Sequence, residues 1–268
     1  MKPLENEQKN AICRLMLSAG ETVLEARQVE ADAGAIREKP GDANFVTVYD
    51  VRVQTQLIEG LRGLFPDAVF LAEEDHCGSG VPQTGDCFVI DPIDGTTNFI
   101  HDMQCSAVSV ALFRDASPLF GAVLDPYRGE LFTAEAGKGA FLNGAPIRVS
   151  QRDLPHALAS FGTSPYDRDR LGDVSFAAAK RIFMRTADIR RSGSAAIDIC
   201  CVACGRTDLF FEFVLSPWDF AAGGLILTEA GGMITDFTGA QARPGAKSSV
   251  LCSNALLHKA ALEIINEA

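Results

Sequence analysis

Apolar side chains in the first half of the chain recur with two periods, one helical and one typical of strands. Over residues 4–33 they follow helical spacing with charges between them, which predicts a long amphipathic helix packed on a sheet. Residues 34–45 have loop composition, and a second helix is predicted over 51–64, ending near Phe65-Pro66. Short apolar runs bounded by turns predict strands at 69–72, 87–91, 106–113, 119–124, 130–135 and 139–142. The three runs from residue 106 to 135 fit an antiparallel meander.

The pattern changes after Val149, where predicted strands and helices alternate. The strands are expected at 157–161, 187–190, 207–213 and 248–252, and the helices at 169–184, 194–204, 218–230 and 254–266. Alternation of this kind is typical of a sheet covered by helices on both faces. We therefore expect two halves, 1–145 and 146–268, and the lack of a Pro/Gly/Ser linker between them predicts a tight interface.

Composition narrows the class of protein. A chain of 268 residues with 47% hydrophobic content can bury a large core. The net charge of −11 disfavours nucleic-acid binding, which needs an excess of Lys and Arg. No apolar run approaches the roughly 20 residues of a membrane span, and the polar start has no signal-peptide core. We expect a soluble cytoplasmic protein that does not bind membranes.

The cysteines are numerous, but their spacing does not indicate a metal site. The chain has eight, and Cys201 and Cys204 form a CxxC without the second CxxC or spaced His pair that a zinc site needs. Cys200, Cys201 and Cys204 fall in the Ala-rich segment 194–204, which is expected to be a buried helix. We therefore predict reduced thiols that pack as small apolar side chains.

The stretch with the clearest chemistry is an apolar run that ends in two aspartates and a glycine. Pro92 keeps the residue before it extended, and Gly95 permits a tight bend, so Asp91 and Asp94 can converge. Two carboxylates this close repel each other unless one is protonated or a cation lies between them. Hard divalent cations such as Mg²⁺ take carboxylate oxygens as ligands, so the pair favours Mg²⁺. The N–H groups of Gly95, Thr96 and Thr97 can meet a phosphate there, and the two threonines can cap a following helical turn. An isolated pattern of this kind is usually only an Asx-Gly turn.

Two further acidic motifs change that interpretation. Residues 67–75 are a second apolar run that ends in acids, and Asp219 starts an apolar helix after Pro217-Trp218. Each alone is explained by a solvated face or by a first-turn charge. Together they bring at least four carboxylates from three segments, as in a two-metal site for phosphoryl transfer.

These motifs resemble a known family. DPIDGTTNF (91–99), LAEED (71–75) and PWDFAAGGLILTEAGG (217–232) resemble, in order and spacing, the inositol monophosphatase family of Mg²⁺-dependent, lithium-sensitive phosphatases. The resemblance extends from about residue 39 to residue 254. It implies a layered α/β/α/β/α sandwich, with an antiparallel sheet in the first half, a mixed sheet in the second and the site between the halves. It also implies a homodimer.

The resemblance assigns roles to residues. The implied ligands of two or three Mg²⁺ ions are Glu73, Asp91, the carbonyl of Ile93, Asp94 and Asp219. A second implied set positions or deprotonates the attacking water, or belongs to the family's mobile loop and base cluster, and it shares Glu73 with the ligands: Asp50, Thr96, Glu73, Glu74 and Lys39. For Asp50 an ordinary helix N-terminal charge is the competing explanation. Direct in-line attack by water, without a phosphoenzyme, is implied in the same way.

The same resemblance also implies which residues contact the substrate. The implied set is Gly95, Thr96, Gly193, Ser194, Ala195 and Glu212, with Thr163 aligning only loosely. Ser194 can equally be a plain helix N-cap. The implied substrate is a small phosphate monoester, myo-inositol monophosphate or a similar polyol phosphate.

Several alternatives remain open at this stage. Ser216-Pro217 departs from many family members beside Asp219, and Glu212 can pair with the ammonium of histidinol phosphate. Sugar and nucleotide bisphosphates are also candidates, with Arg190 and Arg191 nearest to a second anionic group. A non-catalytic binding or assembly protein is the alternative from a different class.

Overall fold

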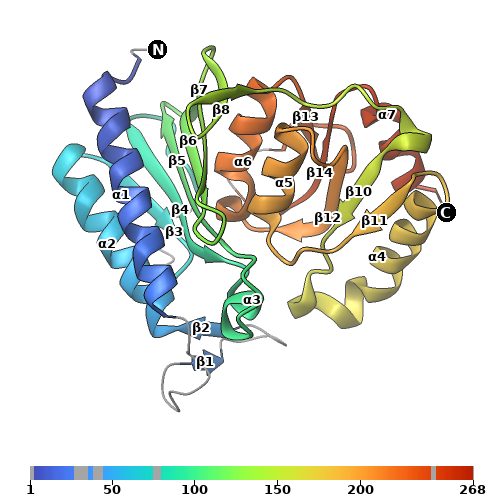
Figure 1. Cartoon of the computed structure of the whole chain (residues 1–268), viewed down its shortest axis with the longest axis horizontal. Helices are drawn as coiled ribbons and strands as arrows, with labels where there is room; N and C mark the ends of the chain where they lie inside the picture. The colour runs from blue at the N-terminus through green and yellow to red at the C-terminus, as the bar shows by residue number, and fades with distance from the viewer. Residues whose placement is uncertain (1–2, 27–35, 39–44, 75–79, 243–245, 268) are drawn as a thin grey trace.

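Helix pairs and two β-sheets stack in the order helices, sheet, helices, sheet, helices (Figure 1). This computed structural model describes residues 3–26, 36–38, 45–74, 80–242 and 246–267. Helices α1 and α2 form one outer layer, α5 and α6 lie between the sheets, and α4 and α7 form the other outer layer. The predicted α/β/α/β/α sandwich is confirmed.

The described elements have the following bounds. The helices are α1 (Asn6–Glu25), α2 (Val48–Leu64), α3 (Thr96–Ile100), α4 (Arg168–Phe183), α5 (Ala195–Ala203), α6 (Pro217–Glu229) and α7 (His258–Ile265). The strands are β1 (Ile36–Glu38), β2 (Phe45–Thr47), β3 (Val69–Ala72), β4 (Asp86–Asp94), β5 (Ala107–Arg114), β6 (Ser117–Asp125), β7 (Glu130–Glu135), β8 (Gly139–Leu142), β9 (Ala145–Ile147), β10 (Leu158–Phe161), β11 (Asp188–Arg190), β12 (Leu209–Leu215), β13 (Met233–Thr235) and β14 (Ser248–Ser253).

The first sheet runs β3-β4-β5-β6-β7-β8-β9, and every neighbouring pair is antiparallel except β3 and β4. Side chains of β4 alternate between its two faces, as a strand buried on both sides requires. Phe88 and Ile90 pack under α1 and α2, whereas Cys87 and Val89 join the core around α5 and α6. The C-terminal end of β4 is thereby held between two hydrophobic layers.

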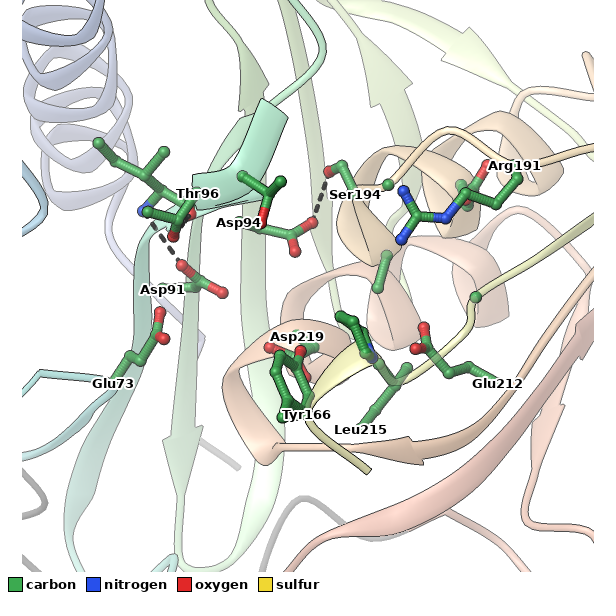
Figure 2. A pocket seen from close by; sticks show the side chains of 18 residues that line it. Glu73, Asp91, Asp94, Thr96, Tyr166, Arg191, Ser194, Glu212, Leu215 and Asp219 are labelled. Atoms are coloured by element: carbon green, nitrogen blue, oxygen red, sulfur yellow. Dashed lines mark hydrogen bonds between the residues drawn. The ribbon is translucent and has the colours of Figure 1, made fainter. Parts of the chain in front are cut away.

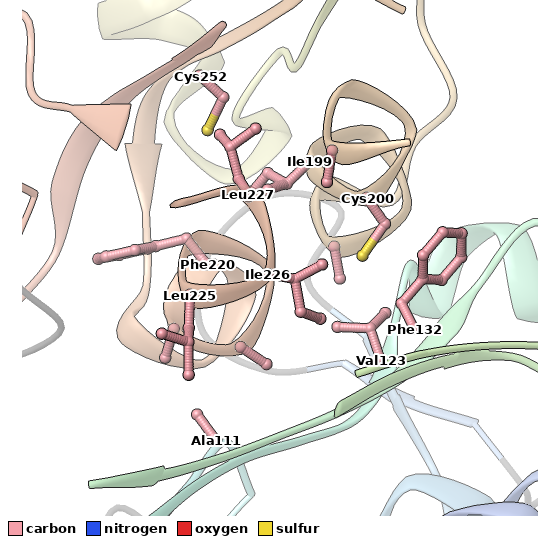
Figure 3. Close-up of a cluster of buried hydrophobic side chains, with 14 of the residues drawn as sticks. Ala111, Val123, Phe132, Ile199, Cys200, Phe220, Leu225, Ile226, Leu227 and Cys252 are labelled. Atoms are coloured by element: carbon pink, nitrogen blue, oxygen red, sulfur yellow. The ribbon is translucent and has the colours of Figure 1, made fainter. Parts of the chain in front are cut away.

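The second sheet is mixed, as expected, with the order β11-β10-β12-β14-β13. Strand β10 is parallel to β11 and β12, and β14 is antiparallel to β12 and β13. Its inner face meets α5 and α6 in the central core, where Leu227 and Ile226 of α6 face Ile199 and Cys200 of α5 (Figure 3). Its outer face is covered by α4 and α7.

The cysteine prediction is confirmed in the described part of the chain. All seven cysteines there are free thiols, and Cys200 and Cys252 lie in the central core. Cys201 and Cys204 are partly buried against the same core. Burial raises the pKa of Cys201 to about 12 and also raises the pKa of Cys204, so both remain thiols at neutral pH.

Several predicted boundaries were wrong. Helix α1 ends at Glu25 within the predicted 4–33, and residues 27–33 lie outside the described ones. Strands β1 and β2 form a small antiparallel sheet at the edges of the expected loop 34–45. The short strands β9 and β13 carry too few residues for a periodic pattern. The division at residue 145 stays a prediction.

Helix α7 begins at His258, although a start at 254 was expected. The side-chain amide of Asn254 donates to Ser150 Oγ and to the carbonyl of Arg152, both at 3.0 Å. The backbone N–H of Asn254 donates to the carbonyl of Asp208, also at 3.0 Å. These contacts tie the residues before the helix to the neighbouring loop, so the helix starts one turn later.

Candidate active site

Asp91 and Asp94 face the same side of the first sheet because β4 bulges between them. Asp91 pairs with Ser109 and Asp94 pairs with Ala107, so three steps along β4 match two steps along β5. In a regular strand, residues three apart point to opposite faces. The extra residue of the bulge turns Asp94 back to the face of Asp91. The sequence DPID is therefore the local cause of a carboxylate pair.

The third carboxylate comes from the first turn of α6. Asp219 is the N3 residue of a capping box, and its Oδ2 accepts a hydrogen bond of 2.7 Å from the N–H of Ser216. One carboxylate oxygen from each of Asp91, Asp94 and Asp219 lies within 4.8 Å of the other two. Figure 2 shows the three side chains converging on one pocket. Three carboxylate oxygens at this spacing are a suitable donor set for a hard divalent cation.

The electrostatics of the cluster also favour a cation. Burial, followed by the charges of Glu73 and Asp94, raises the pKa of Asp91 well above its ordinary value. Burial, followed by the charges of Asp94 and Glu73, does the same for the pKa of Asp219. The pKa of Asp94 rises to about 6, mainly through burial and against the hydrogen bonds it accepts. Negative charge in this pocket is therefore unfavourable without a positive partner.

The other predicted ligands lie beside the cluster. Glu73 follows β3, and its N–H donates to the carbonyl of Ile90 on the parallel strand β4 at 3.2 Å, which keeps the two strand ends together. Glu73 and Ile93 both line the pocket. Glu74 is not among the residues that line it, and its N–H donates to Gln54 Oε1 at 3.0 Å. Lys39 lies outside the described residues.

Asp50 lies behind the pocket and reaches it through Thr96. It is fully buried at the N3 position of α2, and its Oδ2 accepts hydrogen bonds from the N–H and hydroxyl of Thr47 at 2.7 and 2.5 Å. Its Oδ1 is 3.2 Å from the hydroxyl of Thr96, which lines the pocket. Asp50 therefore belongs to the capping box of α2, and its other oxygen is directed at Thr96.

The turn at Gly95 differs in detail from the expectation. Gly95 itself is the N-cap of α3, with φ of +93°, and no side chain caps this helix. A Cβ at Gly95 would lie 3.0 Å from the carbonyl oxygen of Gly193, so glycine is needed for conformation and for space. Thr96 and Thr97 are the first residues of α3 and do not cap it.

The two halves meet directly at this point. Asp94 Oδ2 accepts hydrogen bonds from the hydroxyl of Ser194 at 2.5 Å and from the N–H of Ala196 at 2.7 Å. The Ser194 hydroxyl also caps α5 by accepting from the N–H of Ile197 at 3.3 Å. The side-chain amide of Asn98 donates to the carbonyls of Cys105 and Ser192 at 2.7 and 2.9 Å, which bridges the same interface.

The wall opposite the carboxylate cluster is formed by Glu212, which is buried (Figure 2). Burial raises the pKa of Glu212 to about 7. Gly193, Ser194 and Ala195 also line the pocket, and their contact with substrate stays a prediction. Thr163 is not a lining residue, and its hydroxyl instead accepts a hydrogen bond of 3.1 Å from Arg191.

The structure adds lining residues that the sequence did not single out. Asp198 is buried in α5, and its Oδ2 accepts a hydrogen bond of 2.6 Å from the hydroxyl of Ser192. A lone acid in the apolar run AAIDICCVA is a signal that could have identified it. Tyr166 also lines the pocket from the short turn before α4, where no motif marks it. Of the two arginines considered, Arg191 lines the pocket, whereas Arg190 pairs with Asp188 at 2.5 Å.

Comparison with known proteins places the chain among phosphatases and their relatives. The chain is 39% identical over 231 residues to Nus factor SuhB of Escherichia coli (strain K12), covering 86% of this chain and 85% of that protein. It is 37% identical over 234 residues to the fructose-1,6-bisphosphatase/inositol-1-monophosphatase of Thermotoga maritima, covering 87% and 86%. The solved structure of a Thermotoga maritima IMPase superposes with a TM-score of 0.87 at 32% identity, covering 98% of this chain and 97% of that one.

Among the described helices, none has the length and apolar character needed to cross a membrane. The model of the inositol monophosphatase family matches residues 5–268. The chain therefore belongs to the inositol monophosphatase family.

Proposed function

We propose that this protein is a Mg²⁺-dependent phosphomonoesterase that hydrolyses myo-inositol monophosphate or a similar small polyol phosphate. The observation that supports it best is the convergence of Asp91, Asp94 and Asp219 at one end of a pocket whose other wall carries Glu212. A phosphate can meet cations at the first end while its alcohol meets hydrogen-bonding groups at the second.

The donor set fits magnesium. Asp91, Asp94 and Asp219, with Glu73 and the carbonyl of Ile93, would hold two or three Mg²⁺ ions, because all five residues line the pocket and supply oxygen. Bound Mg²⁺ supplies positive charge to the phosphate and lowers the pKa of coordinated water. The carboxylates also restrict where the phosphate can lie, because they repel it wherever their charge is not balanced.

Thr96 and Asp50 would handle the proton of the attacking water. The Thr96 hydroxyl faces the pocket and is 3.2 Å from Asp50 Oδ1, so it can accept a hydrogen bond from water while donating its own proton to Asp50. Asp50 is enclosed and its other oxygen is held by Thr47, which directs Oδ1 at Thr96. Gly95 would contact the phosphate. Lys39 and Glu74 stay predictions.

Arg191 favours a second class of substrate, the sugar bisphosphates. Within the described part of the chain, the Arg191 guanidinium makes its one hydrogen bond to the neutral hydroxyl of Thr163, and its charge also acts on Glu212. It lies on the Glu212 side of the pocket, away from Glu73 (Figure 2). A sugar bisphosphate could place its second phosphate there, and the Thermotoga relative is named for both activities. Histidinol phosphate stays an alternative, because Glu212 attracts its ammonium whereas Arg191 repels it.

A binding or assembly role is the alternative from another class. The Escherichia coli relative is named a Nus factor. That role does not require the full carboxylate set, which is present here. Phosphate release therefore separates the two functions.

The test is phosphate release with Mg²⁺ and with EDTA from four substrates: inositol 1-phosphate, histidinol phosphate, fructose 1,6-bisphosphate and adenosine 3′,5′-bisphosphate. We expect preference for inositol 1-phosphate, loss in EDTA, inhibition by lithium, and at least about 100-fold loss in Asp94→Asn. Arg191→Gln should weaken only the bisphosphates, whereas Arg190→Gln should act like wild type. No release from any substrate would favour the binding role.

A further inference from the structure

Glu212 is held in one orientation by a short loop behind it. Gly162 to Ser164 follow β10, and the N–H of Gly162 donates to the carbonyl of Phe211 at 3.0 Å, which places the loop beside β12. Glu212 Oε1 accepts hydrogen bonds from the N–H and the hydroxyl of Ser164, at 2.8 and 3.1 Å. Ser164 is fully buried and does not line the pocket, so it acts from behind the glutamate.

The other oxygen of Glu212 is left for a ligand. Among the described residues, Oε2 accepts no hydrogen bond. Glu212 is only 7% exposed and lines the pocket. Because the described residues supply no donor to Oε2 while Glu212 lines the pocket, this atom is suited to a donor that arrives with the substrate.

Two backbone features preserve this orientation. A Cβ at Gly162 would lie 1.8 Å from Glu212 Oε2, so the carboxylate occupies space that only glycine leaves free. Ser164 has φ of +42°, in the left-handed region, and this conformation directs its N–H to Oε1. Its hydroxyl is also 3.1 Å from the carbonyl of Val214, which fixes the serine between two neighbours on β12.

We infer that Ser164 is a positioning residue for leaving-group recognition. By satisfying Oε1 of Glu212 from within the protein, it presents Oε2 to a hydroxyl of the leaving group. This inference rests on the proposed phosphatase function and adds to its leaving-group site a residue that acts through Glu212. The preferred leaving groups are alcohols that carry at least one further hydroxyl at the Glu212 wall. A leaving group without such donors gains nothing from Ser164.

The experiment compares two phosphate monoesters in the full-length protein with Mg²⁺. Inositol 1-phosphate has further hydroxyls on its leaving group, whereas p-nitrophenyl phosphate has none. We expect Ser164→Ala to raise KM for inositol 1-phosphate by about 5-fold with little change in kcat, the size of one hydrogen bond. Constants for p-nitrophenyl phosphate should stay within about 2-fold of wild type. In a Glu212→Gln background the same substitution should add little, because its partner has changed.

Matched variants separate positioning from folding. Ser175→Ala also removes a buried serine hydroxyl, one without a hydrogen-bond partner in the described chain, and should leave both substrates unaffected. If Ser164→Ala does not fold, Ser164→Gly keeps the N–H and the left-handed conformation and should show the same substrate split.

Three results would overturn the inference. They are an equal loss for both substrates in the Ser164 variants, no loss for either in those variants, or an unsubstituted protein that hydrolyses p-nitrophenyl phosphate but not inositol 1-phosphate. If the wild-type protein hydrolyses neither substrate, the proposed function fails as well. The two failures are therefore distinguishable.

Discussion

Asp50 and Asp219 each serve a helix and the candidate site at the same time. Both are N3 residues of capping boxes, and in each one oxygen accepts a hydrogen bond of 2.7 Å from the N–H of the N-cap residue. The cap immobilises the carboxylate, so its second oxygen has a defined direction. A capping role and a role in the site are therefore compatible for these residues.

Asp198 should make the stability of the protein depend on pH. Burial raises its pKa to about 7 from an ordinary 3.8, so the folded state holds the proton more tightly than the unfolded state. The free energy of unfolding should fall as pH rises from about 4 to about 7, by roughly 3 kcal/mol from this group. Asp198→Asn should remove that part of the decrease.

Urea unfolding in EDTA at several pH values from 4 to 8 measures this difference. The side chains that face Asp198 are Ser192, Ser160, Asp94 and Glu212, and they are unchanged in the variant, so their own titration largely cancels. Asp188→Asn, at an exposed aspartate whose pKa is lowered by its hydrogen bond with Arg190, is the control and should retain the decrease in stability above pH 4. Equal pH dependence in Asp198→Asn and wild type would contradict the prediction.

At the scale of elements, periodicity predicted most of the fold. The strand run at 87–91 and the helix run at 218–230 were recognisable because their apolar residues are buried on both sides, as in β4 and α6. Strands β9 and β13 were missed because each has three residues and gains its order from pairing with β8 or β14. Pairing between distant strands leaves little local signal.

Gly121 sets how closely α6 approaches the first sheet. A Cβ there would lie 2.9 Å from the carbonyl oxygen of Ala222, one turn after Asp219. Gly121→Ala should therefore push the helix outwards and lower the free energy of unfolding by about 1–3 kcal/mol. It should also weaken Mg²⁺ binding, because α6 carries Asp219.

Urea unfolding and Mg²⁺ titration test the two effects of Gly121→Ala. Gly63→Ala is the matched control, since Gly63 lies in α2 with no atom near its missing Cβ. That variant should be as stable as wild type or more stable by up to about 1 kcal/mol. Close packing of α6 would be refuted if the two alanine variants had equal stability.

At the scale of the whole molecule, the sequence predicted which segments carry the carboxylates but not what supports them. Asp91, Asp94 and Asp219 stand in motifs that are visible along the chain. Ser164 and Asn98 do not, because their roles depend on which carbonyls and carboxylates the folded halves bring within reach. Such contacts follow from the packing of the two sheets, which local patterns do not encode.

Adding Mg²⁺ should reverse which of two proteins, wild type or Asp219→Asn, is the more stable, because the ion binds at the carboxylate cluster. Burial and mutual repulsion raise the pKa of Asp91 and Asp219, so their ionised forms destabilise the fold at pH 8. In EDTA, Asp219→Asn should be at least as stable as wild type, since asparagine keeps an acceptor for the N–H of Ser216. With Mg²⁺ at about 100 times its Kd, wild type should gain about 2.7 kcal/mol.

Thermal unfolding in EDTA and in Mg²⁺, at constant ionic strength set with KCl, measures this reversal. Constant ionic strength matters because the chain has a net charge of −11, and any salt screens its repulsion. Screening acts on both proteins alike, whereas an ion at Asp91, Asp94 and Asp219 loses one of its three carboxylates in Asp219→Asn. A selective rise in the Tm of wild type therefore reports occupation of this cluster independently of catalysis. An equal rise in both proteins would show that Mg²⁺ acts elsewhere on the surface.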